Sequence, residues 1–216
     1  MEIVLADGGS YCVVIRNWLT ATEGKDLWEL CKSQVLWETY SVRTPVGPVA
    51  APHLAYACGD PELKCHGFAG QRTPMHPWPP AVQALRDRVQ AESKLYCNSC
   101  LMLQYRTLSD SVGRHADTEC LPPYNVVVSV SIGQTRIFKL RHNVTGVITK
   151  VPLYHGDACL MYGTTQETHK HYIDKEPKRV VEAEWGGIRC VFTFRQLGGP
   201  NLCKPAIKPP TQVVIE

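Results

Sequence analysis

Short apolar segments follow one another through the second half of this sequence, and they limit the folds that the chain can adopt. The segments have the length of β-strands and alternate with turns that contain Gly, Pro, Asn or Asp. We predict strands at residues 98–105, 125–132, 135–141, 145–153, 157–163, 169–173 and 189–196. Many short strands in close succession are typical of a β-sandwich or a β-barrel. The sequence therefore predicts a mainly β core.

The first half of the chain predicts one early strand and two helices. Residues 11–15 form a short apolar run, and the pattern from Thr20 to Glu23 is a capping box, which opens a helix. A second helix is expected to start near Pro80, because proline is favoured at the first helical position. Residues 44–80 are rich in Pro and Gly, which indicates loops and short edge strands rather than the interior of a sheet.

The length of 216 residues suits one domain with a sizeable core, and two smaller domains are the alternative. We assign residues 1–203 to this domain and residues 204–216, which include three prolines, to a tail. The hydrophobic fraction of 44% and the charged fraction of 20% are ordinary for a globular protein. Because the formal charge is only +3, contact with nucleic acid requires a local basic patch.

The ten cysteines are expected to be free thiols of an intracellular protein, because their spacing is irregular and the start of the chain has no secretory pattern. Cys97 and Cys100 have the spacing of half a zinc site, but no second pair follows, so we interpret them as structural. The glycosylation sequon at Asn143 carries little weight without a secretory signal. No apolar run has the length of a membrane span.

His115 and Asp117 are candidate metal ligands. In an extended chain, residues two apart point to the same side, so an imidazole and a carboxylate share one face. His171 can supply a second imidazole, and His169, two residues before it, is the alternative. Two histidines and one carboxylate on one face of an iron leave three positions open, as in non-haem Fe(II) oxygenases.

Arg189 and Arg195 are candidate anion-binding residues. The alternation of residues 189–195 puts both arginines on one strand face and turns Cys190, Phe192 and Phe194 into apolar packing. Guanidinium groups bind carboxylates through paired hydrogen bonds. Two of them on one face therefore indicate a dicarboxylate ligand, although a surface position for both is the alternative.

These residues resemble the AlkB family of Fe(II)/2-oxoglutarate dioxygenases in their order and approximate spacing. The resemblance extends to residues 98–105, 128–133, 155–157 and 193–196, and it covers roughly residues 50–199. Some AlkB domains of plant RNA viruses have a stretch similar to residues 168–171. The resemblance implies an α+β, mainly β fold, with a double-stranded β-helix (jelly-roll) core and N-terminal helices packed on one sheet.

The resemblance also implies roles for the candidate residues. It makes His115, Asp117 and His171 the ligands of Fe(II). It assigns Arg189 and Tyr105 to the distal carboxylate of 2-oxoglutarate, and Arg195 to the metal end of the site. One departure is Leu103, which stands where AlkB itself has an asparagine, while the adjacent Gln104 is expected to face the other way.

Substrate contacts are also implied by the resemblance. Glu119 corresponds to an acid that contacts the exocyclic amine of the target base, and Phe68 to an aromatic residue that stacks on that base. A solvated turn and a core position are the respective alternatives. Arg72 is a candidate phosphate contact, as are Lys139, Arg141 and Lys170. Residues 44–80 resemble the family's nucleotide-recognition lid.

The implied function is oxidative demethylation of 1-methyladenine or 3-methylcytosine in RNA or DNA. The reaction uses Fe(II), O2 and 2-oxoglutarate and releases succinate, CO2 and formaldehyde. The alternatives are hydroxylation or demethylation of a protein or small molecule by the same site, and a binding module with an inactive site. We expect an intracellular monomer, in the nucleus or cytoplasm or as a viral protein in a host cytoplasm, that binds methylated RNA or DNA and no membrane.

Overall fold

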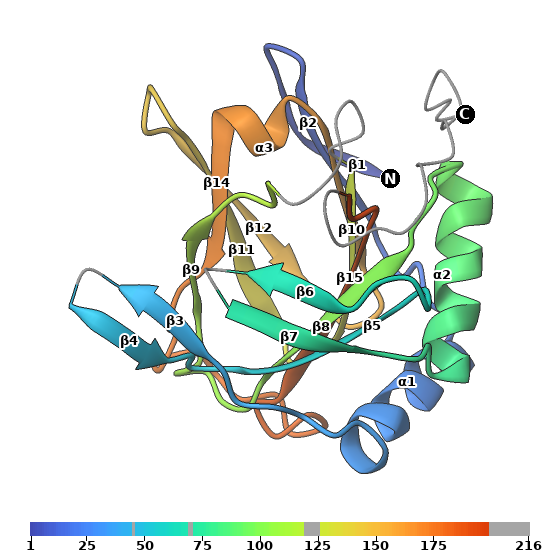
Figure 1. Ribbon diagram of the computed structural model, residues 1–216. Helices are drawn as coiled ribbons and strands as arrows, with labels where there is room; N and C mark the ends of the chain where they lie inside the picture. The colour runs from blue at the N-terminus through green and yellow to red at the C-terminus, as the bar shows by residue number, and fades with distance from the viewer. Residues whose placement is uncertain (45, 69–70, 119–125, 199–216) are drawn as a thin grey trace.

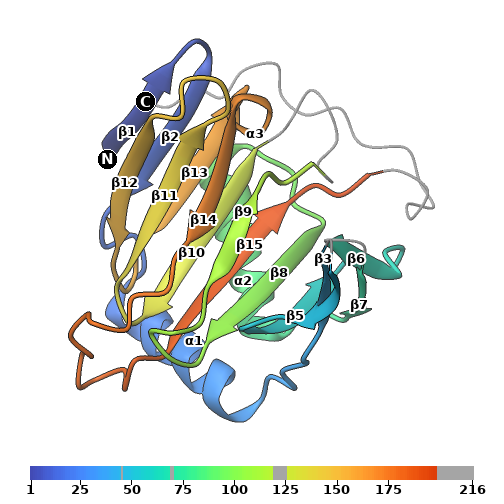
Figure 2. The ribbon, with the colours of Figure 1, turned by 90° about the vertical axis from the view of Figure 1, so that its left-hand side faces the viewer.

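A computed structural model of the protein describes residues 1–44, 46–68, 71–118 and 126–198, and two of its β-sheets lie face to face (Figure 1, Figure 2). Within these residues the larger sheet has the order β1 (Glu2–Asp7), β2 (Ser10–Ile15), β13 (Ala158–Gly163), β10 (Val127–Gly133), β15 (Arg189–Arg195), β8 (Ser99–Tyr105), β5 (Leu54–Gly59), β7 (Gln71–His76) and β6 (Cys65–Phe68). The smaller sheet has the order β12 (Ile148–Leu153), β11 (Arg136–His142), β14 (His169–Ile173) and β9 (Val112–His115). A separate hairpin pairs β3 (Ser41–Thr44) with β4 (Gly47–Ala50).

Strands of the second half of the chain are distributed between the two sheets. From β8 to β15 the chain crosses repeatedly from one sheet to the other, so that β10 pairs with β13 and β15, and β11 pairs with β12 and β14. This is the predicted double-stranded β-helix. The helices α1 (Ala21–Ser33) and α2 (Pro80–Ser93) cover the larger sheet on the side away from the smaller one, and the short α3 (Thr165–Thr168) precedes β14 (Figure 1).

Both long helices begin where the sequence predicts. Thr20 caps α1, because its side chain accepts a hydrogen bond from the Glu23 amide and the Glu23 carboxylate accepts one from the Thr20 amide. Pro80 is the first residue of α2. Leu27 and Leu85 then bury apolar faces of the two helices against the larger sheet.

Strand β15 separates the two apolar layers of the protein. Phe192 and Phe194 are 0% exposed and pack with the helices on one side of the sheet. Val191 faces the space between the sheets, where it contacts a second apolar cluster. Full burial of one phenylalanine side chain stabilises a fold by roughly 1.5–3 kcal/mol, so this alternation fixes which side of β15 faces the helices.

The segment 44–80 departs from its prediction in one respect. It was expected to form only loops and edge strands, but β5 lies in the interior of the larger sheet, between β8 and β7. The physical reason is that the prolines of this segment flank Leu54–Gly59 and leave its amides free to pair with β8. The strands β1 and β9 were also not predicted.

In the described part of the chain every cysteine is a free thiol. Cys97 and Cys100 are both buried, and Cys100 is 0% exposed beneath the helices. Among the described residues, the helices are all too short or too polar to cross a membrane.

Candidate metal and carboxylate site

Two neighbouring strands of the smaller sheet bring two histidines together. His115 ends β9 and is paired directly with His171 of β14, and the centroids of the two rings are 4.2 Å apart. Asp117 follows β9 by two residues, and its carboxylate oxygens lie 3.7 Å from Nε2 of His115 and 3.8 Å from Nε2 of His171. One donor atom from each residue lies within 4.8 Å of the others. Ligands at about 2 Å from one ion are at most about 4 Å apart, so a small inward movement of these side chains suffices to hold a metal.

The protonation of these groups suits metal binding. Burial by itself would raise the pKa of Asp117, but the positive charge of Arg195, followed by interactions with the neighbouring histidines, outweighs it and holds this pKa well below its usual value. Burial and the neighbouring His115 lower the pKa of His171 to about 3, so its ring is neutral near pH 7. Nδ1 of His115 donates a hydrogen bond to the carbonyl of Gly113 at 2.8 Å, so that Nε2 is the nitrogen that faces Asp117.

The structure distinguishes between His171 and its alternative. His169 lies on the same strand, but its ring packs edge-on against His142 at 4.9 Å and its Nδ1 contacts the Thr168 hydroxyl at 2.8 Å. It does not belong to the group of three donors found among the described residues. His171 is therefore the histidine that the fold brings to His115 and Asp117.

A cavity of ≈ 50 Å³ lies between the sheets and joins these three residues to both arginines and to Tyr105. Along an extended strand, six residues separate Arg189 from Arg195 by about 20 Å at their α-carbons, so the two side chains must lean toward each other to line one cavity. Nη1 of Arg195 lies 3.0 Å from Oδ1 of Asp117. Arg195 therefore occupies the metal end of the cavity.

Arg189 lies deeper in the cavity and has unused donors. It is 2% exposed, and Nη2 donates a hydrogen bond to the Ser131 hydroxyl at 2.9 Å. Nε and Nη1 have no hydrogen-bond partner among the described residues, and burial lowers the pKa of the guanidinium. The guanidinium carbon is 5.2 Å from the centroid of the Tyr105 ring, which is directly opposite Arg189 in the β8–β15 pair. A buried cation with unsatisfied donors fits a carboxylate ligand.

A model of the 2OG-Fe(II) oxygenase superfamily matches residues 11–195 of the chain. Human alpha-ketoglutarate-dependent dioxygenase alkB homolog 3 is 34% identical over 109 residues, which are 46% of this chain and 38% of the human protein. Mouse DNA oxidative demethylase ALKBH2 is 29% identical over 177 residues, which are 78% of this chain and 67% of that protein. The chain belongs to the AlkB family of 2OG-Fe(II) oxygenases. The solved structure of OsALKBH1 has the same fold, with a TM-score of 0.61 and 24% identity over 86% of this chain and 97% of that one.

The enzymes of this superfamily use Fe(II), 2-oxoglutarate and O2, and the AlkB-type site of this chain fits the first two. Two imidazoles and one carboxylate are a donor set that Fe(II) accepts. The unsatisfied donors of Arg189 fit the free end of a dicarboxylate. Leu103 lines the cavity, whereas Gln104 faces the other side of the sheet and contacts Cys190.

Two residues that the sequence analysis missed support the AlkB-type site. The side-chain oxygen of Gln166, in α3, accepts a hydrogen bond from the Asp117 amide at 2.9 Å and so holds the turn after β9. Ser131, in β10, anchors Arg189. Gln166 lies in no recognisable motif, and Ser131 lies in the stretch 128–133 that resembles the family but was given no role; both reach the site only through the pairing of distant segments.

The predicted base contacts are not placed by the structure. Glu119 and the side chains of Phe68 and Arg72 lie outside the described residues, so their roles remain predictions. Lys139, Arg141 and Lys170 are described, and they lie on the outer face of the smaller sheet.

Proposed function

We propose that this protein oxidatively demethylates N-methylated nucleobases of the 1-methyladenine and 3-methylcytosine type in RNA or DNA. The observation that carries the proposal is the convergence of the three candidate metal ligands and the two arginines on one cavity. Bound Fe(II) supplies oxidation of the methyl group by O2, coupled to conversion of 2-oxoglutarate to succinate and CO2. The hydroxylated methyl group then leaves as formaldehyde.

Different residues of the site would bind the iron, bind 2-oxoglutarate and exclude water. His115, Asp117 and His171 would hold Fe(II) through two imidazoles and one carboxylate. Arg189 and Tyr105 hold the distal carboxylate of 2-oxoglutarate. Arg195 holds the Asp117 carboxylate in place and faces the metal end of the co-substrate. Aliphatic side chains of the remaining wall, among them Leu103, Val112 and Ile173, exclude bulk water.

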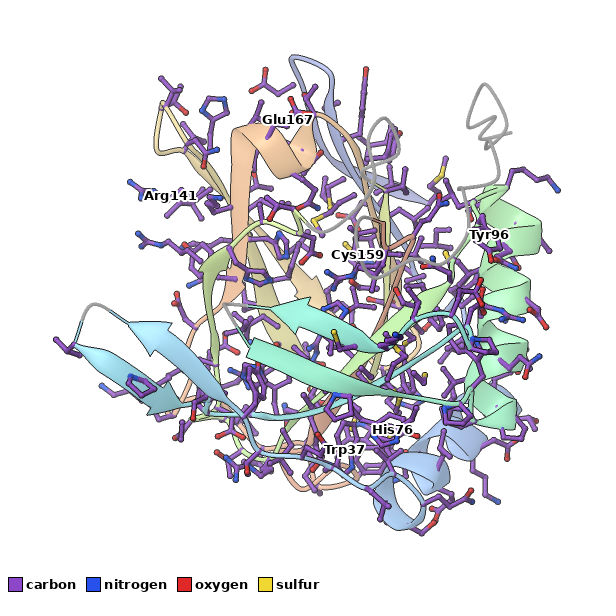
Figure 3. The ribbon with its side chains drawn as sticks, viewed as in Figure 1. Trp37, His76, Tyr96, Arg141, Cys159 and Glu167 are labelled. Carbon is purple, nitrogen blue, oxygen red and sulfur yellow. The ribbon has the colours of Figure 1, made fainter. Side chains whose placement is uncertain are left out.

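A basic outer face of the smaller sheet supports a nucleic-acid substrate. We use the name basic face for Arg114, Lys139, Arg141, Lys150 and Lys170. The register places Lys139 opposite Lys150 and Arg141 opposite Lys170, and Arg141 points outward from β11 (Figure 3). Lys139 is paired with the Asp174 carboxylate at 2.7 Å. A phosphate backbone bound to this face would gain affinity from the release of counterions.

The relatives support the same substrate class, since one matched relative is named as a DNA oxidative demethylase. The segment 44–80, which contributes β4 to β7, is proposed as the lid over the nucleotide. Demethylation of a protein or small molecule by the same site is the alternative, and it predicts no preference for methylated oligonucleotides.

The test is mass spectrometry of oligonucleotides that each carry one 1-methyladenine or 3-methylcytosine, as RNA and as DNA. We expect incubation with Fe(II), 2-oxoglutarate and O2 to remove the methyl mass, with one formaldehyde and one succinate formed for each methyl lost. His169→Ala is the matched control for His171→Ala, because only His171 lies in the donor group. Succinate release that methylated oligonucleotides do not stimulate would contradict the proposal.

A further inference from the structure

A further histidine, His66, has no hydrogen-bond partner in the described part of the fold. His66 lies in β6 and is 1% exposed, and neither Nδ1 nor Nε2 has a hydrogen-bond partner among the described residues. Buried polar side-chain atoms are hydrogen-bonded in the large majority of cases, because an unsatisfied one weakens the fold. An imidazole with two unsatisfied nitrogens therefore requires an explanation.

Another buried histidine shows what a structural role looks like in this protein. His53 is 2% exposed, and both of its nitrogens are satisfied, Nε2 by the hydroxyl of Tyr40 and Nδ1 by the carbonyl of Ser111 at 2.8 Å. These contacts tie the chain before β5 to the chain before β9. His66 makes no such tie within the described residues, so packing alone does not account for a polar ring at this position.

The surroundings of His66 connect it with the metal end of the cavity. Burial, followed by the positive charge of Arg195, lowers the pKa of His66 to about 3, and the carboxylate of Asp117 opposes this shift. Arg195 and Asp117 are the same two residues that meet at 3.0 Å beside the candidate metal ligands. His66 lies on β6, which pairs with β7 at the end of the larger sheet (Figure 1), and it interacts electrostatically with this metal end of the cavity.

We propose that His66 is a specificity-determining residue, which accepts a hydrogen bond from the exocyclic amine of the methylated base. This inference rests on the proposed function. A neutral imidazole always has one acceptor nitrogen, and 1-methyladenine and 3-methylcytosine carry a positive charge that makes their exocyclic amine a strong donor. A neutral acceptor beside Arg195 can bind this cationic base, whereas a lysine or arginine in place of His66 would repel it. The base then satisfies a nitrogen that the described protein leaves unsatisfied.

The test compares His66→Phe with His66→Gln, and it uses His53→Phe as a stability control. Phenylalanine keeps a planar ring but removes the polar atoms, and glutamine restores a hydrogen-bonding group. Because replacing an unsatisfied polar group by an apolar one of similar shape is neutral or stabilising, we expect His66→Phe to unfold at the same or a higher temperature than wild type. His53→Phe, which loses two made hydrogen bonds, should unfold at a lower temperature.

Binding is measured anaerobically on protein loaded with Fe(II) and 2-oxoglutarate, with single-stranded oligonucleotides that carry one 3-methylcytosine. We expect His66→Phe to bind about tenfold more weakly than wild type, as for the loss of one hydrogen bond to a charged group. Its visible absorption band for the loaded iron should be unchanged, and His66→Gln should recover most of the affinity. An oligonucleotide with 3-methyluracil, which has a carbonyl in place of the amine, should show little change between wild type and His66→Phe.

Three results would overturn the inference. The first is a fall in the unfolding temperature of His66→Phe that matches His53→Phe, since His66 would then have a structural role. The second is unchanged affinity for 3-methylcytosine, and the third is an equal loss for 3-methyluracil, which would remove the amine as the partner. Wild-type protein that neither binds nor demethylates methylated oligonucleotides would contradict the proposed function itself, and the role of His66 with it.

Discussion

Replacing Arg189 with methionine should weaken the binding of 2-oxoglutarate by about two orders of magnitude or more. Arg189 is buried, and its Nε and Nη1 have no partner among the described residues. A carboxylate that reaches these donors forms a buried, hydrogen-bonded charge pair. Removing one member of such a pair costs roughly 3–5 kcal/mol, and each 1.4 kcal/mol is a factor of ten in the dissociation constant.

The same substitution should leave the ligand-free protein nearly as stable as wild type. Arg189→Met loses the hydrogen bond to Ser131, which contributes roughly 1 kcal/mol, and the interaction with the Tyr105 hydroxyl. It also removes a buried cation, whose desolvation opposes folding. The two effects offset one another. Arg189→Met should therefore weaken the binding of 2-oxoglutarate without a comparable loss of stability.

Thermal unfolding with and without 2-oxoglutarate measures both effects. With Mn(II) in place of iron and ligand at 100 times the wild-type dissociation constant, wild type should gain about 2.7 kcal/mol. For a chain of 216 residues this corresponds to a rise in the unfolding midpoint of about 5–11 °C. Arg189→Met should gain about 1 °C or less at the same ligand concentration, since its site is then less than half filled.

Arg136 provides the matched control. It is also buried, at 0% exposed, but its guanidinium donates to the Glu176 carboxylate at 2.9 Å and to the carbonyls of Asp110 and Asp174 at 2.8 and 2.6 Å. Arg136→Met should therefore lower the midpoint without ligand and keep most of the 2-oxoglutarate shift. Equal ligand shifts in wild type and Arg189→Met would refute the assignment of Arg189 to the carboxylate.

Three further predictions follow from the site and its surroundings. His171→Ala should abolish demethylation and the visible band of the iron–2-oxoglutarate complex, whereas His169→Ala should keep both; the reverse result would exchange the two histidines. The double variant Lys139→Glu, Arg141→Glu should weaken oligonucleotide binding. The slope of the logarithm of the binding constant against the logarithm of the salt concentration should fall by about two, one for each lost phosphate contact. An unchanged slope would show that the basic face does not bind the phosphate backbone. The free energy of unfolding of the metal-free protein should fall between about pH 6.5 and pH 3, because burial lowers the pKa of His66 and His171 from 6.5 to about 3. Between these pH values both histidines bind protons in the unfolded chain, whereas in the folded chain they stay neutral. Urea unfolding at several pH values measures this, and His66→Phe should show a shallower dependence; a flat wild-type profile would contradict it.

The parts of the structure that depend on local pattern were predictable from the sequence. The strand segments from residue 98 onward other than β9, the capping box at Thr20 and the helix start at Pro80 all follow from local sequence rules. His115 and Asp117 are two residues apart, and the family resemblance supplied the distant partner His171. The convergence of these residues on one cavity agrees with the prediction, while their roles as ligands stay a proposal.

The parts that depend on long-range pairing were not predictable. β9 is short and carries Gly113, Arg114 and His115, so it has no apolar alternation, and it becomes a strand only by pairing with β14. Ser131 is an ordinary strand residue until β15 places Arg189 next to it. His66 carries no motif, and its unsatisfied nitrogens are visible only once the fold has buried them.

The apolar core determines the geometry of the site through strand register. Tyr105 faces Arg189 across β8 and β15, and a slip of one residue would turn Arg189 toward the helices and Phe192 into the cavity. Such a slip would take Phe192 and Phe194 out of their packing with the helices, which contributes roughly 1.5–3 kcal/mol for each side chain, and would leave a buried arginine among apolar side chains. The large apolar side chains on one face of β15 therefore hold the two arginines on the other face. A substitution such as Phe192→Ala, in a side chain that never touches the cavity, should for this reason loosen 2-oxoglutarate binding as well as destabilise the fold.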